Sequence, residues 1–77
     1  MNKTNDQLMD ALAKKFLRTF EDWEKKIYKD EVIDKIENKI FNLIYEEIIQ
    51  DKDIKYFPRP IDFERLEYRI RHKGYGF

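Results

Sequence analysis

The sequence predicts a mainly α-helical fold, an antiparallel helical hairpin followed by a short third helix near the C-terminus, in one domain spanning residues 1–77. Apolar side chains recur at helical spacing through residues 5–28 and 31–50, and no glycine or proline interrupts the chain before Pro58. A chain of this size buries only about 60–65% of the surface that it exposes when unfolded, so few elements must share one small core.

The second predicted helix, residues 31–50, should form the centre of that core. An isoleucine recurs every four residues, which places the series on one face of a 3.6-residue helix. The series consists of Ile36, Ile40, Ile44 and Ile48. The same face is widened by Ile33, Leu43 and Ile49.

The first predicted helix, residues 5–28, begins after a matching N-terminal signal, because Thr4 and Gln7 have the spacing of a capping box. Its apolar residues then alternate at spacings of four and three, the pattern of one helix face. These residues are Met9, Ala13, Phe16, Phe20, Trp23 and Ile27, broadened by Leu8, Leu12 and Leu17. We expect Phe16, Phe20, Trp23 and Phe41 to be core residues for this reason.

The phase of the two apolar series argues against one continuous helix over residues 5–50. Continued onward, the first series meets Asp30 and Asp34, whereas the second series begins at Ile33. We therefore predict a turn near residues 28–31, with Asp30 as the N-cap of the second helix, so that the two faces meet as an antiparallel hairpin. A dimer of long or domain-swapped helices would satisfy the same pattern.

Residues 51–61 are predicted to be an extended linker, because Pro58 and Pro60 disfavour the α conformation in the residues before them. A short helix over residues 62–73 should follow. Asp62 is its predicted N-cap, and Ile61 and Leu66 have the spacing of a hydrophobic staple. Gly74 would end this helix and leave residues 74–77 as a tail.

The C-terminal region also fits a second pattern. Leu66, Tyr68 and Ile70 alternate with charged residues as in a strand. An α+β fold, in which residues 54–57 pair with this segment in a small C-terminal β-hairpin, is therefore the alternative.

The residues available for chemistry exclude several classes of active site. The chain has no cysteine and no serine, His72 is its one histidine, and both glycines lie beyond residue 73. A hydrolytic triad, a Cys/His zinc site and a glycine-rich phosphate loop are thus excluded. Asp51 and Asp53 have the spacing that starts a calcium loop, but Lys55 occupies the next ligand position. We expect a protein that is not an enzyme and holds no cofactor or metal.

Charge and aromatic residues are unevenly distributed. Residues 1–53 carry ten basic and thirteen acidic side chains, whereas residues 54–77 carry six and three, together with six of the twelve aromatic residues. Aromatic residues beside arginines are typical of protein-binding surfaces. The predicted partner-binding residues are Tyr56, Phe57, Arg59, Arg65, Tyr68, Arg69, Arg71, His72, Lys73, Tyr75 and Phe77.

These observations favour a small, non-catalytic protein–protein interaction module that binds another protein through its C-terminal third. The size, and a composition rich in lysine and isoleucine, suggest a regulator or inhibitor encoded by a phage or mobile element. Because no disulfide supports so small a core, we expect a homodimer. No apolar run approaches the length of a membrane span, and we expect the protein in the cytoplasm, that of the host if a phage encodes it.

Three alternatives remain open at this point. A dimer could present residues 65–73 as a basic stripe to nucleic acid, with the nearby aromatic rings stacking on exposed bases. The chain could be a small structural or scaffold component. The arginines could also pair with the acidic face of their own domain instead of with any partner.

Overall fold

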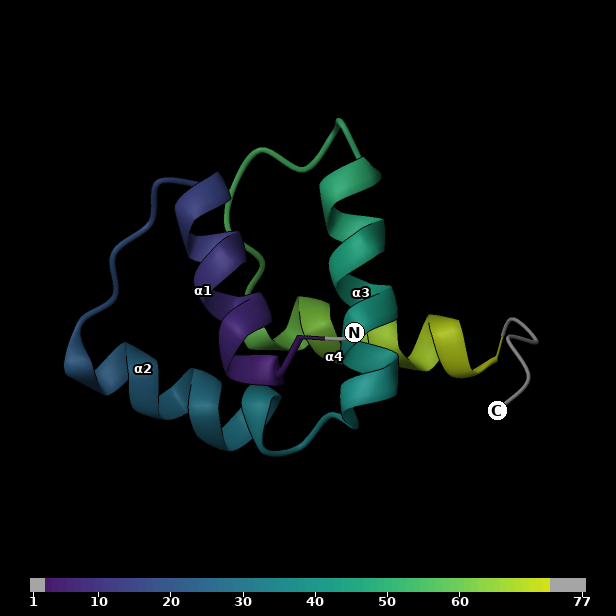
Figure 1. Cartoon of the computed structure of the whole chain (residues 1–77), viewed down its shortest axis with the longest axis horizontal. Helices are drawn as coiled ribbons and strands as arrows, with labels where there is room; N and C mark the ends of the chain where they lie inside the picture. Colours follow the sequence, from purple (N-terminus) through teal and green to yellow (C-terminus); the bar gives the residue numbers. More distant parts are fainter. Residues whose placement is uncertain (1–2, 73–77) are drawn as a thin grey trace.

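The computed structural model describes residues 3–72 and is mainly helical (Figure 1). Its elements are α1 (Asn5–Lys15), α2 (Asp22–Tyr28), the π-helical turn η1 (Lys29–Ile33), α3 (Asn38–Gln50) and α4 (Pro60–Arg71). The mainly α-helical class is therefore confirmed. Residues 3–72 contain no strand, so the alternative with a C-terminal β-hairpin is wrong for this part of the chain.

The antiparallel hairpin is not what the structure shows. Helices α1 and α3 lie side by side, and both run upward in Figure 1. Their N-terminal ends are joined, because the Asn38 side-chain amide donates hydrogen bonds of 2.8 Å to the Asn5 side-chain oxygen and to the Lys3 carbonyl. The segment formed by α2 and η1 returns the chain to the starting end of α1 before α3 begins.

The predicted first helix, residues 5–28, is two helices. Helix α1 ends at Lys15, and residues 16–21 form a loop before α2. The end of α1 has the hydrogen bonds of a Schellman motif: Arg18 N–H donates to the Ala13 carbonyl at 2.8 Å and Leu17 N–H to the Lys14 carbonyl at 3.2 Å. This loop lets the aromatic residues that follow fold back over the core.

The predicted turn at residues 28–31 is also wrong, because the chain stays helical from α2 into η1. In η1 the Asp34 N–H bonds to the Lys29 carbonyl at 2.9 Å, a π-helical spacing that inserts one residue into the helix. The inserted residue shifts the phase of the apolar series and brings Val32 into the core. The break before α3 falls at residues 34–37. The phase difference between the two apolar series of the sequence is accommodated by this break and by η1.

One of the three N-terminal helix caps predicted from the sequence is observed. Thr4 and Gln7 form the predicted capping box at α1. Asp30 lies inside η1 and caps nothing, and Asp62 is the third residue of α4, accepting a 3.0 Å bond from the N–H of its N-cap Arg59. Pro60 occupies the first helical position, where its missing N–H is not needed.

Helix α4 therefore begins two residues before the prediction, and the proposed staple does not form, because Ile61 lies within the helix and is exposed. The linker accordingly spans residues 51–59. The predicted C-terminal cap at Gly74 and the tail at residues 74–77 lie outside the described residues.

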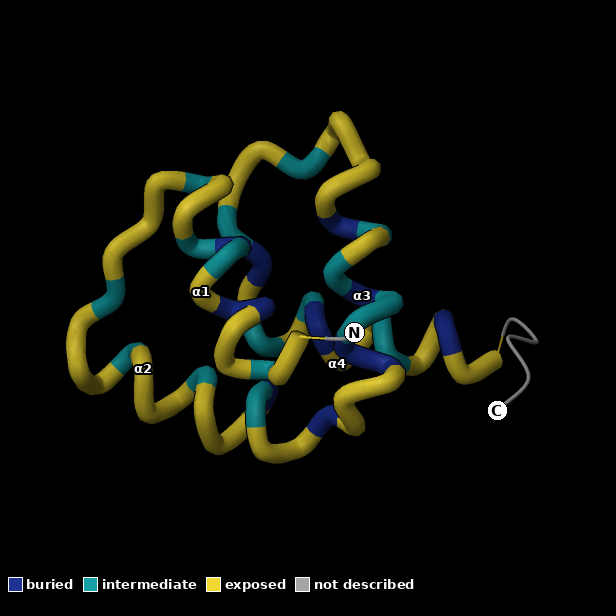
Figure 2. The backbone as a smooth tube through the Cα atoms, in the orientation of Figure 1, coloured by how far each residue is buried: buried dark blue, intermediate teal, exposed yellow. Residues whose placement is uncertain are grey.

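The core lies where α1, η1, α3 and α4 face one another (Figure 2). The isoleucine series of α3 is buried as predicted. The buried core residues are Leu8, Met9, Leu12, Val32, Ile36, Ile40, Phe41, Ile44, Ile48, Phe63 and Ile70. Four predicted apolar-face residues are instead exposed: Leu17 (93%), Trp23 (62%), Ile27 (40%) and Ile49 (42%).

Helix α4 belongs to this core. Its Phe63 and Ile70 are fully buried, and the Phe63 ring stacks on Phe41 of α3 with centroids 5.8 Å apart. Removing residues 55–77 would therefore take two buried residues out of the core and open it.

Asn5 holds the unwound segment before α3 in place. Its side-chain amide donates to the carbonyl of Ile33 at 2.9 Å and to that of Ile36 at 2.8 Å. Both carbonyls lie at the irregular segment between η1 and α3, where the regular backbone hydrogen bonds of a helix are interrupted. One side chain of α1 thus satisfies backbone groups that the interruption leaves open.

We predict that Phe63→Ala lowers the free energy of unfolding by about 3–5 kcal/mol, the range for a fully buried phenylalanine. For a chain of this length that is a large part of the total. Urea unfolding followed by circular dichroism measures the change. Tyr68→Ala, on the exposed side of the same helix, should change it by no more than about 0.5 kcal/mol; equal losses for the two variants would contradict the assignment of the core.

We predict that Asn5→Asp destabilises the fold by about 1–3 kcal/mol at neutral pH, because a carboxylate donates no hydrogen bond and faces two carbonyl oxygens. Protonating the introduced carboxyl restores one donor, so part of the loss should be recovered in acid. Gln50→Glu, which makes the same amide-to-carboxylate change at an exposed side chain at the end of α3, is the control. The melting temperatures of both variants are measured across pH. A difference in melting temperature between them that does not change with pH would refute the role of Asn5.

Candidate interaction surface

A groove runs between α4 and the linker that precedes it. Its volume is about 590 Å³. Apolar side chains of Ile54, Tyr56 and Leu66 form part of its lining, and Arg59, Arg65 and Arg69 add three guanidinium groups. Five of the residues predicted to bind a partner are therefore brought together here: Tyr56, Phe57, Arg59, Arg65 and Arg69.

The linker wall of this groove is fixed by a cluster of aromatic rings. Phe57 packs edge-on against Phe16, Phe20 and Tyr28, with centroid distances of 5.9, 4.9 and 5.5 Å. The Tyr28 hydroxyl donates a 2.8 Å hydrogen bond to the carbonyl of Pro58, which is itself buried. The linker therefore lacks regular structure but is held at two consecutive residues, and the groove has a defined wall.

The Tyr28 hydroxyl has a perturbed acidity. Burial is the main cause that raises the pKa of this phenol, and the nearby Arg18 guanidinium partly opposes the rise. The neutral phenol is the form that donates to the Pro58 carbonyl. The bond that holds the linker is consequently kept at and well above neutral pH.

The three arginines of the groove differ in how they are paired. Arg59 lies 3.6 Å from the Asp62 carboxylate, and Arg69 lies 2.7 Å from that of Glu47. Arg65 is exposed and makes no ion pair or hydrogen bond with any residue that the structure describes. A free guanidinium, which can bind a carboxylate in a bidentate fashion, thus lies between two paired ones.

Arg71 lies away from the groove. It pairs with Glu67 at 3.3 Å and with Glu37 at 3.9 Å. With the Arg69–Glu47 pair, it ties α4 to α3 at two places, although exposed pairs of this kind contribute only about 0.2–1 kcal/mol each. The alternative in which arginines pair within their own domain therefore describes Arg69 and Arg71.

Two tyrosines flank Arg65 and are freely accessible. Tyr56 is 84% exposed and Tyr68 is 66% exposed, and the His72 ring lies against Tyr68 with centroids 4.1 Å apart. Arg65, Tyr68 and Ile61 also line a second, more open hollow of about 400 Å³ on the outer side of α4. Arg65 is shared by both hollows.

The remaining predicted residues have other positions. Phe57 belongs to the aromatic cluster and is not the exposed ring that the sequence suggested, although one side of it reaches the groove. Lys73, Tyr75 and Phe77 lie outside the described residues. Ile61 is a surface residue that was not among those predicted to bind a partner. Its spacing of four from Arg65 and seven from Tyr68 is the signal that places all three on one helix face.

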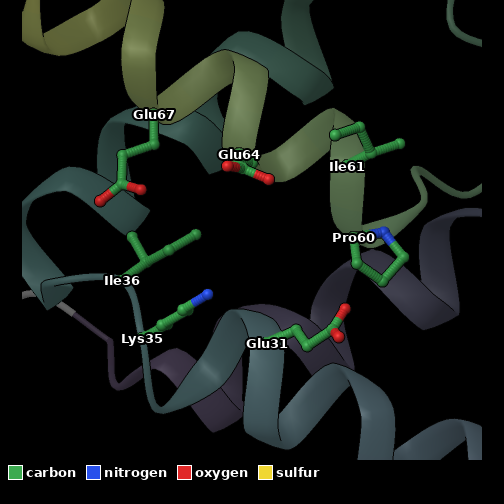
Figure 3. Close-up of a pocket in the computed structure, with 7 residues that line it drawn as sticks. All are labelled: Glu31, Lys35, Ile36, Pro60, Ile61, Glu64 and Glu67. Carbon is green, nitrogen blue, oxygen red and sulfur yellow. The ribbon is translucent and has the colours of Figure 1, made fainter.

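A further hollow lies on the opposite flank of α4, against η1 (Figure 3). It has a volume of about 450 Å³ and is lined by Glu31, Lys35, Ile36, Pro60, Ile61, Glu64 and Glu67.

Within residues 3–72, no group of three or more potential ligands is arranged to hold a metal ion. No helix of that same region has the length and apolar content needed to cross a membrane.

Comparison of the chain with models of protein families, with curated proteins and with solved structures gave no match.

We predict that Tyr28→Phe, which keeps the ring but removes the bond to Pro58, lowers the free energy of unfolding by about 1 kcal/mol near neutral pH. The pKa of Tyr28 is higher in the folded state, so its contribution is complete below the unfolded-state pKa and is lost as pH rises through the folded-state pKa. The difference between the two proteins should therefore shrink above about pH 10.

Denaturant titrations at neutral and alkaline pH test this prediction. Tyr56→Phe is the matched control, since the exposed Tyr56 hydroxyl makes no hydrogen bond within the described chain and its loss should change stability at neither pH. A Tyr28→Phe difference that persists undiminished in alkali would contradict the assignment.

Proposed function

We propose that this chain is a small, non-catalytic protein–protein interaction module that binds its partner through the α4 surface, defined here as Tyr56, Arg59, Arg65, Tyr68 and Arg69. The observation that carries the proposal is the exposed, unpaired Arg65 between two exposed tyrosines beside a preformed groove. Tyrosine and arginine are enriched among residues that dominate binding energy at interfaces.

The rigidity of this surface supports binding. Helix α4 is anchored by Phe63 and Ile70 in the core, and the opposite wall is anchored by Phe57. A surface already held in one conformation loses less entropy when it binds than one that must order first. The groove therefore has the properties of a preformed recognition site.

The chemistry of the α4 surface specifies a class of ligand segment. Its lining combines apolar side chains with Lys55 and three guanidinium groups, which outnumber the carboxylates of Asp51 and Asp62, and the Arg65 guanidinium is free. A segment that places a carboxylate beside an apolar or aromatic side chain would complement both features. We propose an acidic, partly apolar segment of another protein as the ligand.

The biological role that we propose is regulation or inhibition of that protein, in a phage or mobile element. Small size and a composition poor in catalytic side chains support this part of the proposal.

Nucleic acid is less well supported as a ligand, because Arg69 and Arg71 already pair with Glu47 and Glu37. Those pairs would have to break before both arginines could contact phosphates.

Affinity capture from cells that naturally produce the protein tests the proposal. The bait variants are the intact chain, Arg65→Glu, Tyr56→Ala and, as a matched control, Lys26→Glu on the exposed side of α2. The captured protein is then titrated calorimetrically against each variant. We expect Arg65→Glu and Tyr56→Ala each to weaken binding by roughly tenfold or more, with no change for Lys26→Glu.

Equal capture by the intact chain and Arg65→Glu would overturn the assignment of the surface. Capture that disappears after nuclease treatment, and falls steeply with salt, would show nucleic acid as the ligand instead. Point variants are required because deleting residues 55–77 removes two core residues, Phe63 and Ile70, together with the surface.

A further inference from the structure

Leu17 is unusual in both its backbone and its side chain. It occupies the residue after the C-cap of α1 with φ of 52°, in the left-handed region where glycine is strongly favoured. Its side chain is 93% exposed, the largest exposure among the large apolar residues of the described chain. Glycine at this position would remove the strain and the exposed apolar surface together.

No contact within the described part of the chain accounts for this side chain. Leu17 lies outside the core and outside the residues packed against it, while the Schellman bonds that it helps to form use only its backbone. The leucine side chain is therefore accessible to a second molecule.

The surroundings of Leu17 are basic. Lys14 and Lys15 are exposed in the last turn of α1, and Arg18 follows in the loop. Arg18 pairs with Glu24, which leaves the two lysines as the charges beside Leu17. We define Leu17 with Lys14 and Lys15 as the knob.

The hollow between η1 and α4 has the opposite character (Figure 3). Glu31, Glu64 and Glu67 line it together with three apolar residues, Pro60 and Ile61 on one side and Ile36 on the other. Glu67 pairs with Arg71, whereas Glu31 and Glu64 make no ion pair or hydrogen bond with other described residues. Lys35 offsets one of these charges, and the hollow stays acidic overall. We define this hollow as the cleft.

We propose that the knob of one copy of this chain docks in the cleft of a second copy. The leucine side chain would contact Ile36, Pro60 and Ile61, and the knob lysines would lie near Glu31 and Glu64. The cleft volume of about 450 Å³ exceeds that of one leucine side chain. The groove on the other flank of α4 is lined by arginines and would repel the same lysines.

The knob and the cleft are different surfaces, at the C-terminal end of α1 and against α4 respectively, so the contact is heterologous. Two knobs facing each other across a two-fold axis would bring four lysines together, which charge disfavours. A heterologous contact leaves one knob and one cleft free at the ends of each pair, so association continues into a ring or a chain of copies.

The first experiment compares stability with self-association. Sedimentation velocity over a concentration series measures the assembly of the intact chain, Leu17→Gly and Leu17→Asn. Leu17→Gly should raise the melting temperature by about 2–4 °C and weaken self-association by roughly tenfold or more. Leu17→Asn, which tolerates positive φ but lacks the apolar side chain, should weaken association similarly.

The second experiment distinguishes a heterologous from a two-fold contact. Leu17→Gly retains a cleft but has no knob, and the double variant Glu31→Lys/Glu64→Lys retains a knob but has no acidic cleft. Each should be monomeric alone, and a mixture of the two should form a one-to-one dimer that grows no further. Lys52→Glu, an exposed charge reversal in the linker, is the control and should assemble like the intact chain, since Lys52 lies outside the knob and the cleft.

An intact chain that stays monomeric at millimolar concentration, or Leu17→Gly that assembles as well as the intact chain, would overturn the proposal. A mixture that shows no dimer would also overturn it. Because none of these readouts involves the α4 surface, the proposal can fail while the proposed function holds, and the reverse is equally possible.

Discussion

The packing of α4 across α3 is the interaction on which the rest of this structure depends. The stack of Phe63 on Phe41 closes the core from the side that the other helices leave open. The same helix carries the exposed Arg65 and Tyr68 on its other faces. In so short a chain one helix must therefore complete the core and also form the surface proposed for recognition, and these two roles are divided between its faces.

The remaining elements position α4 and its groove. The break after α1 lets Phe20 and Tyr28 turn back onto Phe57, and the Tyr28 hydroxyl fixes the linker at Pro58. The π turn in η1 corrects the phase of the chain so that Val32 reaches the core. Without these two irregularities the linker would have no aromatic support, and the groove would lack one wall.

The features that the sequence predicted correctly are those set by local pattern. The capping box at Thr4 and the buried isoleucines of α3 follow from spacing alone. The sequence placed Tyr56 and Arg65 in the same basic, aromatic C-terminal third, but it did not predict that the two residues line one groove. Its geometry depends on Phe57, which was assigned to the surface but is held by the aromatic cluster.

The features that were mispredicted depend on contacts between distant residues or on rare backbone states. A one-residue π insertion has no sequence signature comparable to that of a cap, so the phase mismatch was assigned to a turn. A leucine at positive φ gives no glycine-like signal for the end of α1, so residues 5–28 were joined. The parallel packing of α1 on α3 is fixed by Asn5 and Asn38, whose partners lie about thirty residues away.

Amide hydrogen exchange, followed residue by residue in solution, tests the central claim about α4 most directly. If α4 completes the core, the amides in the middle of α4 should open only when the whole domain unfolds, with the same free energy of opening as those in the middle of α3. Protection confined to α1 and α3, with α4 exchanging by local opening, would contradict the claim that this helix closes the fold.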